Sequence, residues 1–309
     1  MPAYNAAKFI SDSIQSVLSQ TFISWELIVI DDGSADNTSD IVKSFSEKDS
    51  RIKLLRQENG RQGKARNAGI KQSRGNLIAL LDADDLWDHD KLERQMKVLE
   101  EQDVDFVFSN ARILYDSSYS KIGSYPDFSS GMVTGKFSGK EMLLLLADSN
   151  RIVTLTAMFK KSAWDRCGGF EEELQYQNCE DYDMWLRMAY NGTSFYGMAD
   201  VLGSYRRHNT GSTSNLISQL LPEINVIEKN NRLGIIPEDK RIKTLTWLYR
   251  VLVLEYYKSC QYGNIWNVVF KSNSFKSNPV SSFKLFCLAF YDIAVFLLKI
   301  PVKKILRKK

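Results

Sequence analysis

The chain has 309 residues, of which 44% are hydrophobic and 25% charged, and this length permits one large globular domain with appendages or two smaller ones. Its net charge is +4, and every charged residue from Lys299 onward is basic, which indicates an anionic surface as a partner. The two histidines, His89 and His208, exclude a zinc protease of the H-E-x-x-H type and any multi-histidine metal centre.

The first half of the chain alternates between helical and strand-like hydrophobic spacing. Helices are predicted at residues 9–18, 37–45, 65–72 and 92–99, with Asn5 as a cap of the first and Asp36 or Asn37 as a cap of the second. Strands are predicted at residues 25–30, 52–55, 77–81 and 104–108. Because strands that alternate with helices are typical of βαβ units, we expect an α/β fold with a mostly parallel, Rossmann-like central sheet flanked by helices.

The second half of the chain becomes helical toward its end. A helix is predicted at residues 140–147, a strand at 152–159, a turn at Gly168-Gly169, a helix at 180–190 and short strands at 195–198 and 201–205. After Asn215 the hydrophobic spacing is purely helical. We therefore divide the chain into a domain at residues 1–212 and a helical C-terminal region at residues 213–309.

Three carboxylates follow the predicted strand at residues 77–81, in the sequence Asp82-Ala83-Asp84-Asp85. Like charges this close raise one another's pKa, so packing alone does not favour them. A divalent cation among them makes them favourable, because Mg²⁺ and Mn²⁺ prefer hard oxygen ligands. A solvated turn that caps the next helix is the alternative, and the motif by itself leaves both interpretations open.

Seven short motifs occur in one order across about residues 1–210. They are Pro2-Ala3-Tyr4-Asn5, Asp31-Asp32-Gly33-Ser34, Ala65-Arg66-Asn67-Ala68-Gly69, Asp82-Ala83-Asp84-Asp85, Gly168-Gly169-Phe170, Glu180-Asp181 and Tyr205-Arg206-Arg207-His208. With this combination the chain resembles the inverting family 2 glycosyltransferases of the GT-A fold, similar to bacterial O-antigen and capsule enzymes that act on lipid-linked acceptors. The resemblance implies a nucleotide-sugar-binding and catalytic domain at residues 1–212. It also implies a missing or truncated first strand, because Met1 stands where that strand finishes, and a start codon placed too late is the expected reason.

The resemblance assigns a metal site to the acidic motif and to the last motif. Asp84 is expected to bind the Mn²⁺ or Mg²⁺ that bridges the donor diphosphate, and Asp82 to lie near either the ribose or the metal. Asp85 either orients the donor sugar or caps the following helix. His208 completes the metal shell in this interpretation, and an exposed loop histidine is the alternative.

The remaining donor contacts are also implied by resemblance. Pro2, Ala3 and Tyr4 are expected to line the base pocket, and Asp31 to accept a hydrogen bond from uracil, which makes the donor a UDP-sugar. Arg66 is expected to face the nucleotide. Arg206 is a candidate phosphate contact, because guanidinium groups pair with phosphate oxygens.

Glu180-Asp181 is the candidate catalytic pair. In the family the second residue of this dyad deprotonates the acceptor hydroxyl, so Asp181 is the expected base. Glu180 and Asp183 are expected to raise its pKa toward a useful value. The alternative is a structural one, because acidic residues are favourable at a helix N-terminus.

The apolar segment at residues 283–300 precedes the basic tail. Lys284, Asp292 and Lys299 fall on one narrow stripe of a helix there, and the uncharged stretch is shorter than the ~20 residues that a spanning helix needs. We expect a helix that lies on an anionic membrane, with packing against the protein's own helical region as the alternative. Scattered cysteines without a C-x-x-C pair agree with the cytoplasmic side of the membrane.

These expectations lead to a function. The chain is expected to transfer a hexose from a UDP-sugar, glucose before galactose, to a polyprenyl-diphosphate-linked sugar such as GlcNAc-diphospho-undecaprenol. The product is a β-linkage, β-1,3 by resemblance, in O-antigen or another surface polysaccharide. The enzyme is expected on the cytoplasmic face of the bacterial inner membrane as a peripheral protein, with no nucleic acid as a partner. A non-catalytic nucleotide-sugar-binding scaffold is the alternative.

Overall fold

The N-terminal part of the molecule is built on a three-stranded parallel sheet. The computed structural model describes residues 1–117, 119, 133–211 and 215–271. The strands pair in the order β1-β2-β3, with Pro2 opposite Ile30 and Leu27 opposite Ile52. Their bounds are β1 Pro2–Ala3, β2 Leu27–Asp31 and β3 Ile52–Arg56.

Helices cover both faces of this sheet, which explains why β2 is a continuous run of buried residues. Val29 packs in one cluster with residues of α1 (Ile10–Leu18) and α2 (Thr38–Ser46). Ile28 and Ile30 pack on the other face against Ala65 of α3 (Arg61–Gln72). The N-terminal half therefore has the βαβ arrangement that the alternating pattern predicts.

The second sheet is mixed, and it corrects the expectation of mostly parallel pairing for this half. Its order is β4-β8-β6-β9-β5, with β7 paired to β9 off this path. Among the described strands of this sheet, β6 and β9 pair in parallel, and the remaining pairs are antiparallel. The bounds are β4 Leu77–Ala79, β5 Leu86–Trp87, β6 Phe106–Tyr115, β7 Gly135–Phe137, β8 Met158–Lys160 and β9 Phe195–Arg207.

An aromatic cluster forms the centre of the larger core, where β6, β8 and β9 meet helix α7. Phe106 stacks on Phe159 and meets the Trp185 ring edge-on, with ring centroids 5.5 and 4.9 Å apart. The helices of this half are α4 Lys91–Glu101, α5 Gly139–Leu146, α6 Lys161–Cys167 and α7 Glu180–Tyr190. The predicted helix at residues 180–190 is confirmed as α7.

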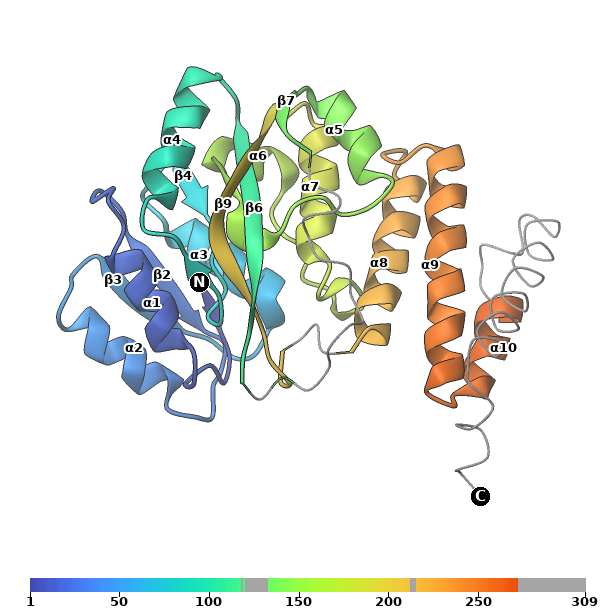
Figure 1. Ribbon diagram of the computed structural model, residues 1–309, viewed down its shortest axis with the longest axis horizontal. Coiled ribbons are helices and arrows are strands. Elements are labelled where there is room, and N and C mark those ends of the chain that lie inside the picture. The colour runs from blue at the N-terminus through green and yellow to red at the C-terminus, as the bar shows by residue number, and fades with distance from the viewer. Residues whose placement is uncertain (118, 120–132, 212–214, 272–309) are drawn as a thin grey trace.

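The C-terminal region is helical as predicted, and its described helices follow one another away from the sheets (Figure 1). They are α8 Ile217–Arg232, α9 Glu238–Lys258 and α10 Tyr262–Lys271. Asp183 of α7 ties α8 to the core through the Lys229 ammonium and the Asn230 amide, at 3.0 and 2.9 Å. The predicted boundary at residues 212–213 and the predicted membrane helix at residues 283–300 lie outside the described residues. In the part of the chain that is described, no helix combines the length and apolar character needed to cross a bilayer.

Several local predictions differ from the structure. Asn5 does not cap α1, because it has a φ of 48° and its side-chain oxygen accepts a hydrogen bond from the Ala35 backbone. Asp36 does bind the N-terminus of α2, accepting from Thr38 N at 3.0 Å. The predicted strand at residues 152–159 is a 3₁₀ turn, Thr154–Thr156, followed by the short strand β8. The two short strands predicted at residues 195–205 are one strand, β9.

Met1 lies beside an apolar cavity of ≈ 320 Å³ that extends between β2 and β4. Its amino group donates to the Ile28 carbonyl at 2.9 Å, directly before Pro2–Ala3 pair with β2 as β1. Trp25, Leu80 and Met96 contribute to the apolar lining of this cavity. The truncation of the first strand stays a prediction.

Two glycines of α3 provide a matched test of how closely this helix is packed. A Cβ on Gly63 would lie 2.1 Å from the Glu171 carbonyl oxygen, whereas a Cβ on Gly69 would lie 3.5 Å from Ile30 Cγ1, an ordinary contact. Alanine gains about 1 kcal/mol over glycine in a helix, but a backbone clash costs about 1–3 kcal/mol. Gly63→Ala should therefore lower the free energy of unfolding in urea, and Gly69→Ala should leave it equal or higher. Equal stabilities of the two variants would contradict the close approach of α3 to Glu171.

Candidate active site

The first two motifs are joined by hydrogen bonds at the carboxyl edge of the parallel sheet. Asp32 N donates to the Ala3 carbonyl at 2.8 Å, and Asn5 N donates to Ser34 Oγ at 3.0 Å. Gly33 makes the intervening turn with a φ of 82°, a conformation that side chains disfavour. Pro2 and Ala3 are buried in β1, but Tyr4 is 54% exposed. The Tyr4 ring is thus accessible at this edge, where the base of a nucleotide is expected.

The two adjacent aspartates at the end of β2 are engaged within the protein. The Asp31 carboxylate is fully buried and accepts hydrogen bonds from Ser34 N and from the Ser39 hydroxyl. Burial alone would raise the pKa of Asp31, but these hydrogen bonds hold it below its usual value. Asp32 accepts from Gly60 N and Arg61 N at 2.9 and 2.8 Å, and thereby fixes the start of α3. The contact of Asp31 with uracil stays a prediction.

The structure brings Asp84 and His208 together although 124 residues separate them. His208 Nε2 lies 2.9 Å from Asp84 Oδ2, and His208 Nδ1 lies 2.8 Å from Thr210 Oγ1. The Phe9 ring packs on the imidazole with centroids 4.5 Å apart. His208 is therefore a held and largely buried side chain, not an exposed loop histidine.

The Asp84–His208 pair supplies only part of the ligand set that a hard divalent cation needs. Among the described residues, no group of three or more His, Cys, Asp or Glu side chains is arranged to hold a metal ion. Mg²⁺ is usually held by one or two carboxylates together with substrate phosphates, and Asp84 supplies one such carboxylate beside the His208 imidazole. Asp82, the third predicted ligand, is directed to Arg66 instead, with Oδ1 2.7 Å from Nη2.

Asp85 and Arg206 hold the acidic segment in place. Asp85 is buried and accepts from Arg206 N at 2.8 Å, and its pKa is raised well above the usual value by burial and by Asp84 and Asp82. Arg206 Nε donates to the Asp84 carbonyl at 2.8 Å and its Nη2 to Asp12 at 2.9 Å. The proposed donor contacts of Asp85 and Arg206 stay predictions, and their observed contacts are structural.

Arg66 of α3 joins the acidic segment to the catalytic dyad. Its guanidinium binds Asp82 with one terminal nitrogen and Glu180 with the other. Burial would lower the pKa of Arg66, but Asp82 and Glu180 raise it, so the group stays charged. Buried atoms Arg66 Nε and Glu180 Oε2 have no hydrogen-bond partner within the described part of the chain. Buried polar atoms without a hydrogen-bond partner are costly in a folded core.

Asp181 is half-buried and held by two donors. Its Oδ1 accepts from Tyr182 N at 2.6 Å, and its Oδ2 accepts from the Thr154 hydroxyl. Burial raises the pKa of Asp181, and Arg66 and the Thr154 hydrogen bond oppose this rise. The pKa of Glu180 is raised as well, mainly by burial, with Arg66 opposing it and Asp181 adding to it. A raised carboxylate pKa suits a general base.

Asp183 does not have the predicted effect on Asp181. Its side chain is fully buried and forms ion pairs with Arg187 at 2.7 Å and Lys229 at 3.0 Å. The two cations neutralise its charge, so it serves the contact between α7 and α8. This corrects the expectation that Asp183 raises the pKa of the base.

Two residues near the base have no sequence signal of their own. Thr154 lies in a segment that the sequence pattern predicts as a strand, and Glu223 belongs to α8 in the C-terminal region. Burial and the nearby Asp181 raise the pKa of Glu223 to about 7. The C-terminal helical region thus places a carboxyl group near the base.

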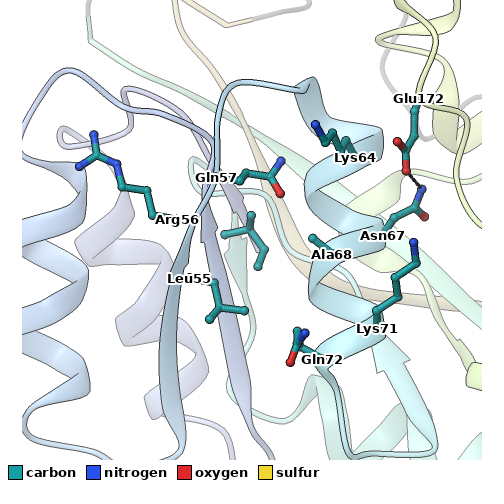
Figure 2. A pocket seen from close by; sticks show the side chains of 10 residues that line it. Leu55, Arg56, Gln57, Lys64, Asn67, Ala68, Lys71, Gln72 and Glu172 are labelled. Carbon is teal, nitrogen blue, oxygen red and sulfur yellow. Dashed lines mark hydrogen bonds between the residues drawn. The ribbon is translucent and has the colours of Figure 1, made fainter.

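A separate pocket of ≈ 480 Å³ lies between β2, β3 and α3 (Figure 2). Figure 2 shows Lys64 and Lys71 of α3 along one side, with Asn67 hydrogen-bonded to Glu172 at 2.8 Å. Leu55 lies on the strand side. None of the predicted site residues lines this pocket.

Comparison with known proteins identifies the family. The sequence profile of Glycosyl transferase family 2 matches residues 1–165. The chain belongs to glycosyltransferase family 2. It is 33% identical over 232 residues to UDP-Glc:alpha-D-GlcNAc-diphosphoundecaprenol beta-1,3-glucosyltransferase WfgD of Escherichia coli, covering 74% of this chain and 83% of that protein. It is 31% identical over 221 residues to the putative teichuronic acid biosynthesis glycosyltransferase TuaG of Bacillus subtilis, covering 69% and 80%.

A solved structure supports the fold of this family 2 glycosyltransferase. The mannosyltransferase PcManGT from Pyrobaculum calidifontis, in complex with GDP-Man and Mn²⁺, superposes with a TM-score of 0.61 over 94% of this chain and 85% of that one. The sequence identity is 17%, so this likeness bears on the fold alone. The predicted GT-A-like α/β fold followed by C-terminal helices is confirmed.

Proposed function

We propose that this glycosyltransferase is metal-dependent and inverting, and that it moves a hexose from a UDP-sugar to a lipid-diphosphate-linked sugar such as GlcNAc-diphospho-undecaprenol. Glucose is the first choice of donor sugar and galactose the second, and the product is a β-1,3 linkage in O-antigen or another surface polysaccharide. One observation carries the proposal. Arg66 connects the segment of Asp84, which suits a diphosphate, to the dyad of Asp181, which suits an acceptor hydroxyl.

On the donor side, the reaction needs groups that stabilise the negative charge developing on the leaving diphosphate. Asp84 and His208 would hold Mn²⁺ or Mg²⁺ together with the diphosphate oxygens, and the cation would neutralise the charge that develops there. Tyr4 would stack on the base beside β1. The fold alone does not select uridine, because the similar mannosyltransferase binds GDP-Man, so UDP is supported by the name of the Escherichia coli relative.

The acceptor half needs a base. Asp181, with a raised pKa, would take the proton from the acceptor hydroxyl as that oxygen attacks the anomeric carbon. The residues described here leave no role for a covalent sugar intermediate in this scheme, so substitution is direct. The acceptor oxygen then attacks from the face opposite the diphosphate, and an α-linked UDP-sugar gives a β-linked product.

The proposed class of acceptor is supported by the names of two relatives. The Escherichia coli relative is named for a diphosphoundecaprenol acceptor, and the Bacillus subtilis relative for teichuronic acid biosynthesis. Together with the basic tail of the sequence, a lipid-linked acceptor supports the proposal of a peripheral enzyme at the cytoplasmic face of the inner membrane, with the anionic surface as a partner. A non-catalytic scaffold would need neither a base at Asp181 nor the Asp84–His208 pair.

Asp84→Ala should weaken the metal-dependent binding of UDP-glucose by roughly 10- to 100-fold and abolish transfer, because it removes a diphosphate anchor. Calorimetric titration with and without Mn²⁺ measures the change. Asp88→Ala is the matched control, because Asp88 pairs with Arg112 at the surface at 2.6 Å and should leave binding unchanged. Full activity of Asp84→Ala with Mn²⁺ present would refute the metal assignment.

Asp181→Asn should lower kcat for transfer to lipid-linked GlcNAc by about 10²–10⁴-fold, the usual contribution of a general base, and leave donor binding nearly intact. Steady-state kinetics and UDP-glucose titration separate the two effects. Glu180→Gln is the comparison, because Glu180 pairs with Arg66 and should act on stability and donor binding as well. A disabled Glu180→Gln beside an active Asp181→Asn would show that Glu180 is the base.

A further inference from the structure

The 3₁₀ turn Thr154–Thr156 faces the proposed base. The Thr154 hydroxyl donates a hydrogen bond to Asp181 Oδ2, and Tyr182 N donates to Oδ1 at 2.6 Å. One donor comes from a neighbouring segment and the other from α7 itself. Together they fix the rotation of the carboxylate about its Cβ–Cγ bond, because each oxygen has its own donor.

The same turn is held from behind by buried side chains. Trp87 Nε1 donates to the Leu155 carbonyl at 2.9 Å, and Gln95 Nε2 donates to the Thr156 carbonyl at 2.7 Å. Gln95 and Leu155 are fully buried, so water cannot replace these contacts. The turn is therefore a fixed support, not a loop that adapts to the base.

Trp87 and Gln95 are themselves linked by one buried lysine. Lys91 Nζ donates to Gln95 Oε1 at 2.5 Å and lies 4.4 Å from the centroid of the Trp87 ring. Trp87 follows the acidic motif by two residues, in β5. A chain of direct contacts thus runs from the segment of Asp84 to the turn that binds Asp181.

We propose that Thr154 is a positioning residue that orients the Asp181 carboxylate toward the acceptor, and that Trp87 and Gln95 hold its turn in register with the acidic segment. The inference rests on the proposed role of Asp181. The Thr154 hydroxyl does not touch the reacting atoms in this scheme. It acts by holding one carboxylate oxygen and leaving the remaining lone pairs to the acceptor proton.

The hydrogen bond also has a predictable effect on titration. A donor to a carboxylate stabilises the ionised form and lowers the pKa, so removal of the hydroxyl should raise the pKa of Asp181 further. The charged and titratable groups that face Asp181 are Arg66 of α3, Asp82 of the acidic motif, Cys179 and Glu180 at the start of α7, and Glu223 of α8. Substitutions at Thr154 leave all of these in place.

The test is a double-mutant cycle with Thr154→Val, Thr154→Ser and Asp181→Asn, measured for sugar transfer and for UDP-glucose hydrolysis, in which water takes the place of the acceptor. Thr154→Val should lower kcat by about 10- to 100-fold with little change in the donor KM, because a hydrogen bond to a charged group is lost. The acid limb of its pH profile should move to higher pH. Thr154→Ser keeps the hydroxyl and should keep most of the activity.

The cycle distinguishes positioning from a structural role. Thr154→Val should have little further effect on catalysis by the Asp181→Asn enzyme, because the side chain that Thr154 orients can no longer act as a base there. An equal loss in both backgrounds, or an equal loss for Val and Ser, would overturn the inference. A wild-type protein that hydrolyses UDP-glucose but transfers nothing to lipid-linked GlcNAc would refute the proposed acceptor. The double-mutant cycle measured by UDP-glucose hydrolysis would still decide the role of Thr154.

Discussion

The site depends on one buried guanidinium. Arg66 has a side chain that is 3% exposed, and it contacts Asp82 on one side and Glu180 on the other. A charge so far from water is tolerated only when it is paired, and removing one partner of a buried pair costs about 3–5 kcal/mol. α3 can bring Arg66 to this place because Gly63 lets the helix approach the Glu171 backbone. The two halves of the site are therefore held at a fixed separation by the core itself.

The carboxylates of the predicted site and its surroundings differ in how many of their oxygen lone pairs remain available to a ligand. Asp31 and Asp32 bind backbone groups and hydroxyls of neighbouring turns, and Asp183 is neutralised by two cations. The Asp84 side chain is 34% exposed, and within the described residues its hydrogen bond is with His208. Asp181 keeps lone pairs beyond its two donors. Burial and hydrogen bonding, more than the number of acids, thus decide which carboxylates are available for chemistry.

The sequence predicted the parts of the site that follow from local pattern. The buried run of β2, the acidic segment after β4 and the bounds of α7 all have periodic or motif signals, and the motif order indicated the family. The contact of Arg66 with Glu180 spans 114 residues, and no spacing rule predicts such a pair. The Arg66–Glu180 contact becomes visible only in the three-dimensional structure.

The apolar stretch at residues 152–159 shows a different limit. A buried turn and a buried strand both appear as a run of apolar residues, so the pattern predicted a strand where Thr154–Thr156 form a 3₁₀ turn. That error concealed the hydrogen bond from Thr154 to Asp181. The mixed second sheet was missed for a similar reason, because periodicity indicates a strand but not the direction of its partner.

In the proposed reaction the sugar nucleotide lies between the Asp84 segment and the base Asp181, so the acceptor attacks opposite the leaving diphosphate. The most direct test is the anomeric configuration of the sugar newly joined to lipid-linked GlcNAc, read from the proton coupling at its anomeric carbon by NMR after reaction with α-linked UDP-glucose. We expect the coupling of a β-linked glucose. The coupling of an α-linked product would contradict direct substitution with Asp181 as the base.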